Sequence, residues 1–170
     1  VDSIMAVTLD ELKKSMRQWA SGVTVVTCEY EGQRGGLTAS SFTSVTLDPP
    51  IILVCLQQHI QTYQLIQKAG HFGVSVLRAD QADLSAQFAG FTSLPDGADR
   101  FHNVPLMTAE TGSPLIAQAA AWMDCRLERI EDVGSNTSIV FGRVVATGQN
   151  DGLPLVYHNR GYFDLLPRQP

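Results

Sequence analysis

The strand-like segments of this chain are joined by connections that are too short for parallel strands. Segments 37–47 and 51–56 are separated only by residues 48–50, where two prolines mark a turn, because proline cannot donate to a strand ladder. Two longer segments, 119–132 and 138–147, are also close neighbours. A parallel crossover needs roughly a dozen residues or more, so we predict an antiparallel sheet. With about six or seven strands and about three helices, the expected fold class is mainly β, a closed antiparallel barrel with helical excursions.

Helices are expected at three places. The first begins near residue 9, because Thr8 and Glu11 have capping-box spacing. The second covers 62–69, and Asp80 can cap a third that runs to about Phe88. The first helix carries apolar residues at helical spacing, and we expect this face to pack on the core. Its members are Leu9, Leu12, Met16 and Trp19.

The remaining strands are predicted from runs of β-branched and apolar residues. They cover 23–28, 72–77 and a short stretch near 155–157. A turn rich in glycine and charge is expected over 29–36. Residues 51–56 are apolar throughout, which is typical of a strand buried on both faces, so Cys55 is expected to be a small buried thiol.

Composition limits the function classes. The 170 residues are 44% apolar and 17% charged, so one domain with its own core is expected over residues 1–170. With 12 basic against 17 acidic residues the net charge is −5, which argues against nucleic acid as a partner, because phosphate binding relies on clustered lysine and arginine. The longest apolar run, 51–56, is far shorter than a membrane span, so no membrane partner is expected.

Cysteine and histidine usage gives no sign of a disulfide framework or a metal site. The three cysteines, Cys28, Cys55 and Cys125, form no CxxC pair, and the four histidines lack metal-ligand spacing. The N-terminal segment has no basic region followed by an apolar core. We therefore expect a cytoplasmic protein rather than a secreted one.

Several common catalytic motifs are absent from the sequence. There is no G-x-G-x-x-G after a strand, no P-loop, no H-E-x-x-H and no G-x-S-x-G nucleophile elbow. A Rossmann dinucleotide domain, metal-assisted hydrolysis and acyl transfer are therefore disfavoured.

The most informative segment is the hydroxyl-rich stretch 36–45, which reads Gly-Leu-Thr-Ala-Ser-Ser-Phe-Thr-Ser-Val. Small hydroxyl residues pack a core poorly, but they supply hydrogen-bond donors to a flat polar ligand that rests against the strand. An exposed strand face rich in threonine and serine has the same composition, so the residues alone leave both interpretations open.

Four motifs, in order along nearly the whole chain, carry a family resemblance. They are Trp-Ala-Ser-Gly-Val-Thr-Val-Val-Thr at 19–27, Thr-Ala-Ser-Ser-Phe at 38–42 with the Asp-Pro-Pro turn, Phe-Ala-Gly at 88–90 with Asp-Arg-Phe at 99–101, and Pro-Leu-Val-Tyr-His at 154–158 with Gly-Tyr at 161–162. The chain resembles the flavin reductase-like proteins, which have an FMN-binding split β-barrel, a Greek-key-type antiparallel barrel. These are the reductase components of two-component flavin-dependent monooxygenases.

The resemblance implies that FMN or FAD, as bound cofactor or as substrate, lies along the hydroxyl-rich strand. Donors there would meet the polar edge of the isoalloxazine, and the end of the next strand would meet the ribityl and phosphate groups. The implied phosphate donors are Ser44, Thr62 and the N–H groups at the start of the following helix. The implied flavin-binding residues are Leu37, Thr38, Ala39, Ser40, Ser41, Ser44, Cys55, Gln57, Gln58, Thr62, Phe88, Ala89, Gly90 and Arg100.

One departure from the family concerns the turn before the penultimate long strand. Relatives usually carry Gly-Asp-His or Gly-Thr-His there, whereas residues 134–138 read Gly-Ser-Asn-Thr-Ser, so Asn136 and Thr137 replace the histidine. The resemblance then implies that His158, Arg160 and Tyr162 position the nicotinamide nucleotide. We expect NADH rather than NADPH, because the acidic composition gives no evident patch for a 2′-phosphate.

The function implied is that of an NAD(P)H:flavin oxidoreductase. Hydride would pass from nicotinamide C4 to flavin N5, and the reduced flavin would supply a partner monooxygenase; no side chain is implied as certainly catalytic. Two alternatives stay open: a flavin-binding electron-transfer protein without steady-state turnover, and an oxidase or oxygenase acting on an organic substrate. Relatives pair as two-fold dimers, so a homodimer is expected, with Trp19, Trp122 and Phe141 as interface or core anchors.

Overall fold

Seven strands form the main sheet of the computed structural model, which describes residues 7–166. They are β2 (Thr24–Tyr30), β3 (Gln33–Ala39), β4 (Thr43–Leu47), β5 (Pro50–Gln57), β6 (His71–Val76), β9 (Ala121–Asp132) and β10 (Thr137–Gln149). Their order across the sheet is β3-β2-β6-β9-β10-β5-β4, and every neighbouring pair is antiparallel. The antiparallel sheet predicted from the short connections is confirmed.

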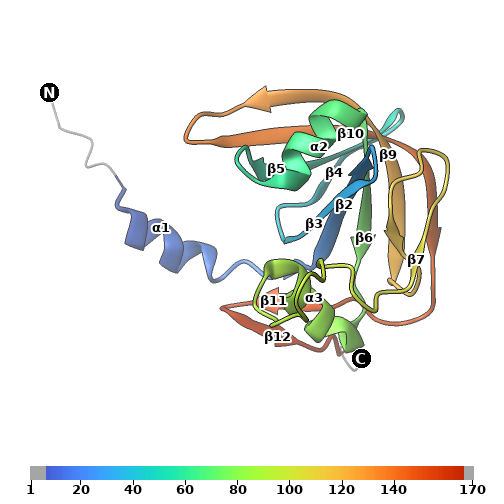
Figure 1. Ribbon diagram of the computed structural model, residues 1–170. Helices are drawn as coiled ribbons and strands as arrows, with labels where there is room; N and C mark the ends of the chain where they lie inside the picture. The colour runs from blue at the N-terminus through green and yellow to red at the C-terminus, as the bar shows by residue number, and fades with distance from the viewer. Residues whose placement is uncertain (1–6, 167–170) are drawn as a thin grey trace, which may run out of the picture.

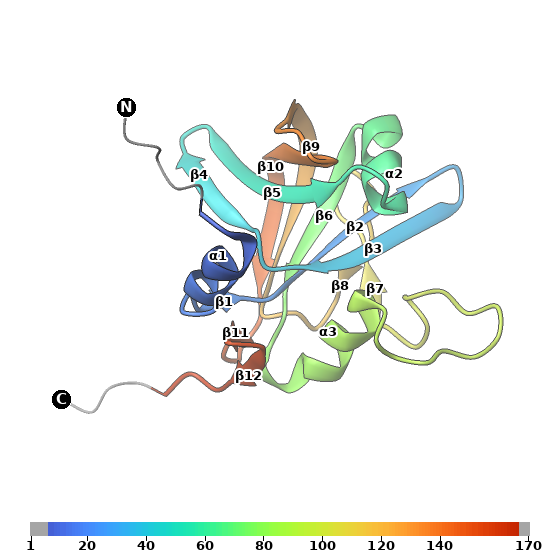
Figure 2. The same ribbon diagram turned by 90° about the vertical axis from the view of Figure 1, so that its left-hand side faces the viewer.

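Short elements surround this sheet. The helices are α1 (Leu9–Met16), α2 (Gln61–Ala69) and α3 (Ala82–Ala89), the last preceded by a 3₁₀ turn, η1 (Ala79–Gln81). The short strands are β1 (Ser21–Gly22), β7 (Leu106–Met107), β8 (Leu115–Ile116), β11 (Val156–His158) and β12 (Gly161–Phe163). Helix α2 lies at one end of the barrel, and α3 lies with the β11–β12 hairpin at the other (Figures 1 and 2).

The sheet curls into a barrel because its two edge strands, β3 and β4, are consecutive in the chain. Only residues 40–42 connect them, and such a connection reaches about 14 Å at most, at about 3.5 Å per residue. The two edges must therefore come together along residues 40–42, which we call the seam. The single strand predicted over 37–47 is wrong in this respect, because the chain changes from one sheet edge to the other at the seam.

Two clusters of buried side chains form the core, one on each face of β2. Val26 belongs to the cluster that includes α2 residues, and Val25 belongs to the cluster that includes Phe88 of α3. Successive side chains of a strand point to opposite faces, so one strand serves both clusters.

Two glycines let the helices approach β3. A Cβ on Gly35 would lie 2.8 Å from Oγ1 of Thr62 in α2, and one on Gly36 would lie 2.5 Å from the Phe88 ring of α3. The turn predicted over 29–36 is therefore wrong. The glycines belong to a strand beneath two helices, and the actual turn is Glu31-Gly32, where both residues have positive φ.

Helix α1 begins as predicted but does not face the core. Thr8 and Glu11 form the capping box, yet Leu12 is 53%, Met16 56% and Trp19 68% exposed. The helix stands away from the barrel (Figure 1). The expected packing of its apolar face on the core is wrong, because no other element among residues 7–166 covers that face.

Local contacts settle two further expectations, those for Asp80 and Phe141. Asp80 does not cap α3: its carboxylate pairs with Arg78 at 2.6 Å, and the helix begins after Gln81 without a side-chain cap. Phe141 is a core residue, lying beneath the Arg129 guanidinium at 3.7 Å. Trp122 is half-buried.

The three cysteines are free thiols in two environments. Cys28 and Cys125 are buried, and burial raises the pKa of each thiol to about 12. Cys55 is exposed, so its expected burial is wrong. Although its neighbours Val54 and Leu56 are buried, Cys55 occupies the opposite face of β5.

The described residues contain neither a membrane-spanning helix nor a cluster of metal-ligating side chains. Within residues 7–166 no helix is long and apolar enough to cross a membrane. In the same part of the chain, no group of three or more His, Cys, Asp or Glu side chains is arranged to hold a metal ion.

Candidate functional site

Three cavities meet at Ser40, the first residue of the seam. The α1 cavity, of about 620 Å³, lies between α1, the seam and the β11–β12 turn. The β5 cavity, of about 340 Å³, is lined by the ends of β3 and β5. The α3 cavity, of about 220 Å³, is lined by α3 and by Tyr157 and Tyr162 of the hairpin. Ser40 lines all three, so they form one hollowed surface around the seam, which we call the seam site.

The β5 cavity gathers half of the residues that the sequence analysis assigned to flavin binding. Ser41 links the two walls, because its Oγ donates to the Cys55 carbonyl (3.0 Å) and accepts from the Cys55 amide (3.1 Å). The predicted residues that line this cavity are Leu37, Thr38, Ala39, Ser40, Ser41, Cys55 and Gln57. Residues that are distant in sequence meet here because the edges of the sheet come together at the seam.

The hydroxyl groups of this strand do not all remain free for a ligand. The Thr38 hydroxyl donates to the Ser85 carbonyl at 2.7 Å, and the Ser41 hydroxyl donates to the Cys55 carbonyl. Within the described chain, the Ser40 hydroxyl and the backbone N–H groups of Ser40, Ser41 and Phe42 have no hydrogen-bond partner. The seam is thus a short row of free donors at the centre of the site.

The α3 cavity has an aromatic wall that is fixed by hydrogen bonds. The Tyr162 hydroxyl donates to Ser85 Oγ at 2.8 Å, and the Tyr157 and Tyr162 rings meet edge to face with centroids 5.7 Å apart. Ala89, one of the predicted flavin contacts, also lines this cavity. The wall is therefore a rigid, largely apolar surface beside the free donors of the seam.

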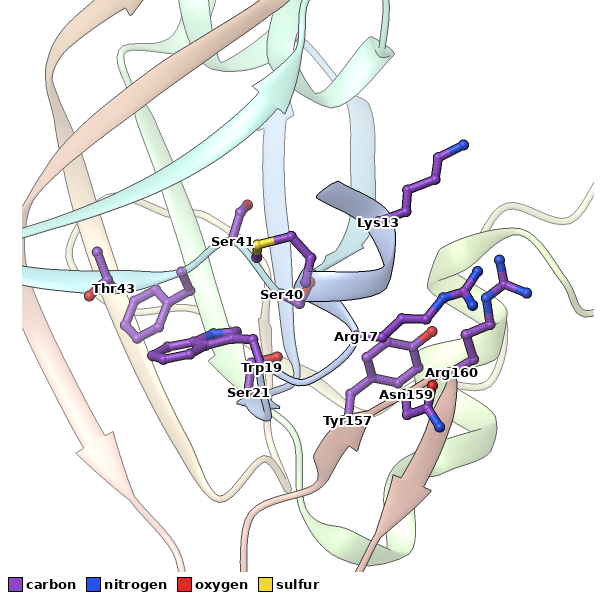
Figure 3. Close-up of a pocket in the computed structure, with 12 residues that line it drawn as sticks. Lys13, Arg17, Trp19, Ser21, Ser40, Ser41, Thr43, Tyr157, Asn159 and Arg160 are labelled. Carbon is purple, nitrogen blue, oxygen red and sulfur yellow. The ribbon is translucent and has the colours of Figure 1, made fainter. Parts of the chain in front are cut away.

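The α1 cavity is bordered by side chains that are far apart in the sequence (Figure 3). Helix α1 and the residues after it provide Lys13, Arg17 and Trp19, and the hairpin turn provides Asn159 and Arg160. The predicted Arg160 therefore belongs to the site. His158 does not line any of these cavities; its ring lies against Phe163, with centroids 5.6 Å apart.

A fourth cavity, of about 410 Å³, adjoins the β5 cavity through Ile60, which lines both. This α2 cavity contains the predicted Thr62 and Arg100. Thr62 is 2% exposed and, among residues 7–166, its hydroxyl has no hydrogen-bond partner. Arg100 is partly used by the fold, because Nη1 donates to the carbonyls of Phe88 (2.8 Å) and Gly36 (3.2 Å).

An ion pair forms the outer rim of the α2 cavity. Arg34 donates from Nε and Nη2 to the two carboxylate oxygens of Asp99, at 2.5 and 3.0 Å. This pairing holds the pKa of Asp99 below its ordinary value. The charge of Arg34 is therefore already neutralised by Asp99. The Thr62 hydroxyl, in contrast, is free to donate to a ligand.

The other predicted residues lie outside these cavities. Ser44 is exposed on β4, Phe88 is fully buried against Phe101, and Gly90 is the left-handed residue that ends α3. The Gln58 amide donates to Ser138 Oγ at 3.0 Å. Thr137 pairs with Gln57 in the ladder, and the Asn136 carbonyl accepts from Gln58 N at 2.8 Å, so the turn that lacks histidine borders the β5 cavity.

Sequence reasoning missed the contribution of α1 and of Tyr157 to the site. Lys13 and Arg17 have i, i+4 spacing on an amphipathic helix, but only the apolar residues of that helix were interpreted, and they were assigned to core packing. Asn-Arg-Gly at 159–161 is a turn-forming sequence. A hairpin there would have pointed to Tyr157 and Tyr162 as cross-strand neighbours, as they are in the structure.

Comparison with known proteins identifies the family. Residues 16–166 match the model of the flavin reductase like domain. This chain belongs to the flavin reductase-like family. Its 154-residue match to a probable flavin reductase of Rhizobium meliloti is 40% identical and covers 89% of the chain but 47% of that protein. The chain thus spans about half the length of this relative.

Two further relatives match over most of their own length. The reductase component of the 4-nitrophenol 4-monooxygenase/4-nitrocatechol 2-monooxygenase of Rhodococcus opacus is 38% identical over 158 residues, covering 92% of this chain and 81% of that protein. The solved NADH:FAD oxidoreductase of Streptomyces globisporus is 30% identical with a TM-score of 0.84, covering 98% of this chain and 100% of that one. That enzyme has also been solved with NAD and FAD fragments. The flavin reductase-like split barrel expected from the sequence is confirmed.

Proposed function

We propose that this flavin reductase-like protein is an NADH-dependent flavin oxidoreductase that takes FMN or FAD. The observation that carries the proposal is the row of free donors at the seam, which stands where three cavities meet. Ligand sites are typically clefts of about 300–1,000 Å³ with a few well-placed polar groups, and the seam site has this form.

The flavin ring system belongs in the β5 cavity in this proposal. Ser40 Oγ and the seam N–H groups donate to its polar edge, where negative charge develops on reduction, and donors fixed in advance stabilise that charge. The ribityl phosphate extends past Ile60 towards the Thr62 hydroxyl and the first N–H groups of α2, which have no side-chain cap. Flavin, when bound, accepts at N5 a hydride from C4 of the reduced nicotinamide.

The nicotinamide enters from the side of the β11–β12 hairpin. Tyr157 and Tyr162 provide a flat wall beside Ser40, and the bond from Tyr162 to Ser85 keeps that wall in place. Holding the two rings in contact is the main task of the protein, because proximity and orientation lower the barrier to transfer. Tyr162 serves this role more directly than His158, whose ring is turned to Phe163, and Arg160 holds the rest of the nicotinamide nucleotide from the hairpin turn.

Reduced flavin leaves this open site and supplies a partner monooxygenase. The chain acts as a cytoplasmic homodimer in which a second copy covers the apolar face of α1. The exposed Leu9 and Leu12 support this assembly, because they do not line the α1 cavity and apolar side chains this exposed are unusual on a solvated arm.

The test is the loss of NADH absorbance with purified protein and FMN, FAD or riboflavin added in turn. Flavin-dependent NADH oxidation at catalytic protein concentration is expected, and replacing Ser40 by Pro, which removes both a hydroxyl and an N–H donor, should abolish most of it. Tight flavin binding with no NADH or NADPH oxidation would instead select the electron-transfer alternative. The turn without histidine at Asn136 is the feature that favours that alternative.

A further inference from the structure

The α1 cavity carries a concentration of positive charge that the acidic chain as a whole does not. Lys13, Arg17 and Arg160 line it, and in the described part of the chain no Asp or Glu does. The net charge of the protein is −5. Three cations around one cavity therefore form a local exception, and they come from two elements that are distant in the sequence.

None of these cations is neutralised by a carboxylate within residues 7–166. The arginines that form ion pairs are Arg34, Arg78, Arg129 and Arg143. Figure 3 shows Lys13, Arg17 and Arg160 extending towards the same side of the cavity. Unpaired guanidinium groups on one side of a cavity are suited to a phosphate, which they can bind with two parallel hydrogen bonds.

The backbone at Arg160 is a second, independent observation. Asn159 and Arg160 form the two-residue turn between β11 and β12, with φ of 45° and 68°. Such turns favour glycine at the second position, because a side chain is strained in the left-handed region. An arginine held in this conformation beside a cavity indicates that the side chain is needed there.

We propose that Lys13, Arg17 and Arg160 bind the pyrophosphate of a dinucleotide, with NADH as the source. This inference rests on the proposed function. The flavin phosphate is assigned to the opposite end of the site, beyond Ile60 in the α2 cavity. The α1 cavity is the remaining large space beside Ser40, so the nicotinamide lies at the seam and its pyrophosphate reaches the three cations.

Helix α1 is in this view a phosphate-binding arm. Its backbone makes no hydrogen bond to the barrel in the part of the chain that the structure describes. Lys13 and Arg17 are one turn apart and share a face, whereas Lys14 is turned by about 100° and does not line the cavity. Lys14 is thus a matched control for removing a charge from the same helix.

The experiment compares Arg17→Ala, Lys13→Ala and Arg160→Gly with Lys14→Ala at saturating FMN. Each cavity variant is expected to raise KM for NADH about tenfold with kcat within about twofold, because a charge-assisted hydrogen bond to phosphate is lost. The dependence of KM on salt should weaken in the same variants, and Lys14→Ala should match the wild type. Equal KM values in the cavity variants and the wild type would overturn the inference.

Further measurements distinguish NADH from FAD as the ligand of the three cations, and they control for misfolding of the variants. Reduced nicotinamide riboside, which carries no phosphate, should be oxidised about equally by wild type and variants. If the variants instead raise KM for FAD but not for FMN or NADH, the cations bind FAD and the NADH assignment is wrong. Arg160→Gly should keep or raise the melting temperature, so a higher KM in that variant does not reflect unfolding.

If the protein is not a flavin reductase, the phosphate site is tested by binding rather than by KM. If the wild type oxidises no NADH with any flavin, calorimetric titration with NAD⁺ still tests the cations. Binding by the wild type that weakens in Arg17→Ala supports the phosphate site without a reductase. Equal binding by both proteins overturns it.

Discussion

Ser41 continues the β4–β5 hairpin beyond the Thr43–Leu53 pair, because its Oγ donates to the Cys55 carbonyl at 3.0 Å and accepts from the Cys55 amide at 3.1 Å. The contact fixes the seam to β5 just after the chain leaves β3. The free donors at Ser40 are held beside β5 by the same contact, so the geometry of the candidate flavin site depends on this one side chain.

Replacing Ser41 by Ala is expected to lower the free energy of unfolding by about 1 kcal/mol, because two hydrogen bonds are exchanged for bonds to water. FMN affinity should fall as well, since the seam donors lose their fixed position. Urea unfolding and fluorescence titration with FMN measure the two effects. Ser44→Ala, on the exposed face of β4, is the control. Unchanged FMN affinity in Ser41→Ala would contradict the role given to the seam.

Cys55 offers a chemical probe of the same cavity. It is the exposed cysteine of the described chain, whereas burial raises the pKa of Cys28 and Cys125 to about 12 and keeps them as unreactive thiols. N-ethylmaleimide should therefore add once to the native protein, at Cys55, and saturating FMN should slow that addition about tenfold or more. Mass spectrometry of peptides reads both results.

The control for this labelling is Cys55→Ser, which should remain unmodified in its native state. Equal labelling rates with and without FMN would show that the β5 cavity is not where flavin binds. Labelling at Cys28 or Cys125 before Cys55 would contradict the burial on which the argument depends.

Features that depend on neighbouring residues were predicted from the sequence, whereas features that depend on the whole fold were not. Short connections predicted the antiparallel sheet, and the 48–50 turn and the capping box at Thr8 were identified because each depends on neighbouring residues. The approach of β3 to β5 at the seam was not predicted, since it depends on the whole sheet curling until its edges come together. The apolar face of α1 was misassigned because helical periodicity shows that a face is apolar without showing what covers it.

Only part of the site was predicted, because the rest depends on how distant elements pack together. The residues of the family motif at 38–41 line one wall of the β5 cavity, and their contact with flavin stays a prediction. Lys13 and Arg17 reach the site only through the position of α1 beside the β11–β12 turn, which no local pattern encodes.

Gly36 is expected to be intolerant of a side chain. A Cβ there would lie 2.5 Å from the Phe88 ring and 3.0 Å from Phe101, both buried in the core. Gly36→Ala should therefore lower the free energy of unfolding by about 1–3 kcal/mol through overpacking. Gly22→Ala, where nothing lies within 4 Å, should stay within about 0.5 kcal/mol of the wild type. Chemical denaturation of the two variants makes the comparison, and equal stabilities would contradict it.

His71 should make the stability of the protein depend on pH. Its Nδ1 lies 2.7 Å from Ser113 Oγ, in a hydrogen-bonded chain that continues through Thr111 to the buried Asp124. Burial lowers the pKa of His71, opposed by the charge of Asp124 and assisted by that of Arg126. The folded state then binds a proton less readily than the unfolded state, whose histidine titrates near pH 6.5.

The stability that His71 contributes is therefore present above about pH 6.5 and is lost as the pH falls below that value. Urea unfolding between about pH 7.5 and about pH 5.5 should show a decline in the free energy of unfolding. His71→Asn, which keeps a side-chain nitrogen near the position of Nδ1, should reduce that decline, while His59→Asn, at an exposed position, should leave it unchanged. A decline as steep in His71→Asn as in the wild type would mean that other groups are responsible. A decline reduced equally in both variants would assign it to histidines in general rather than to the partly buried position of His71.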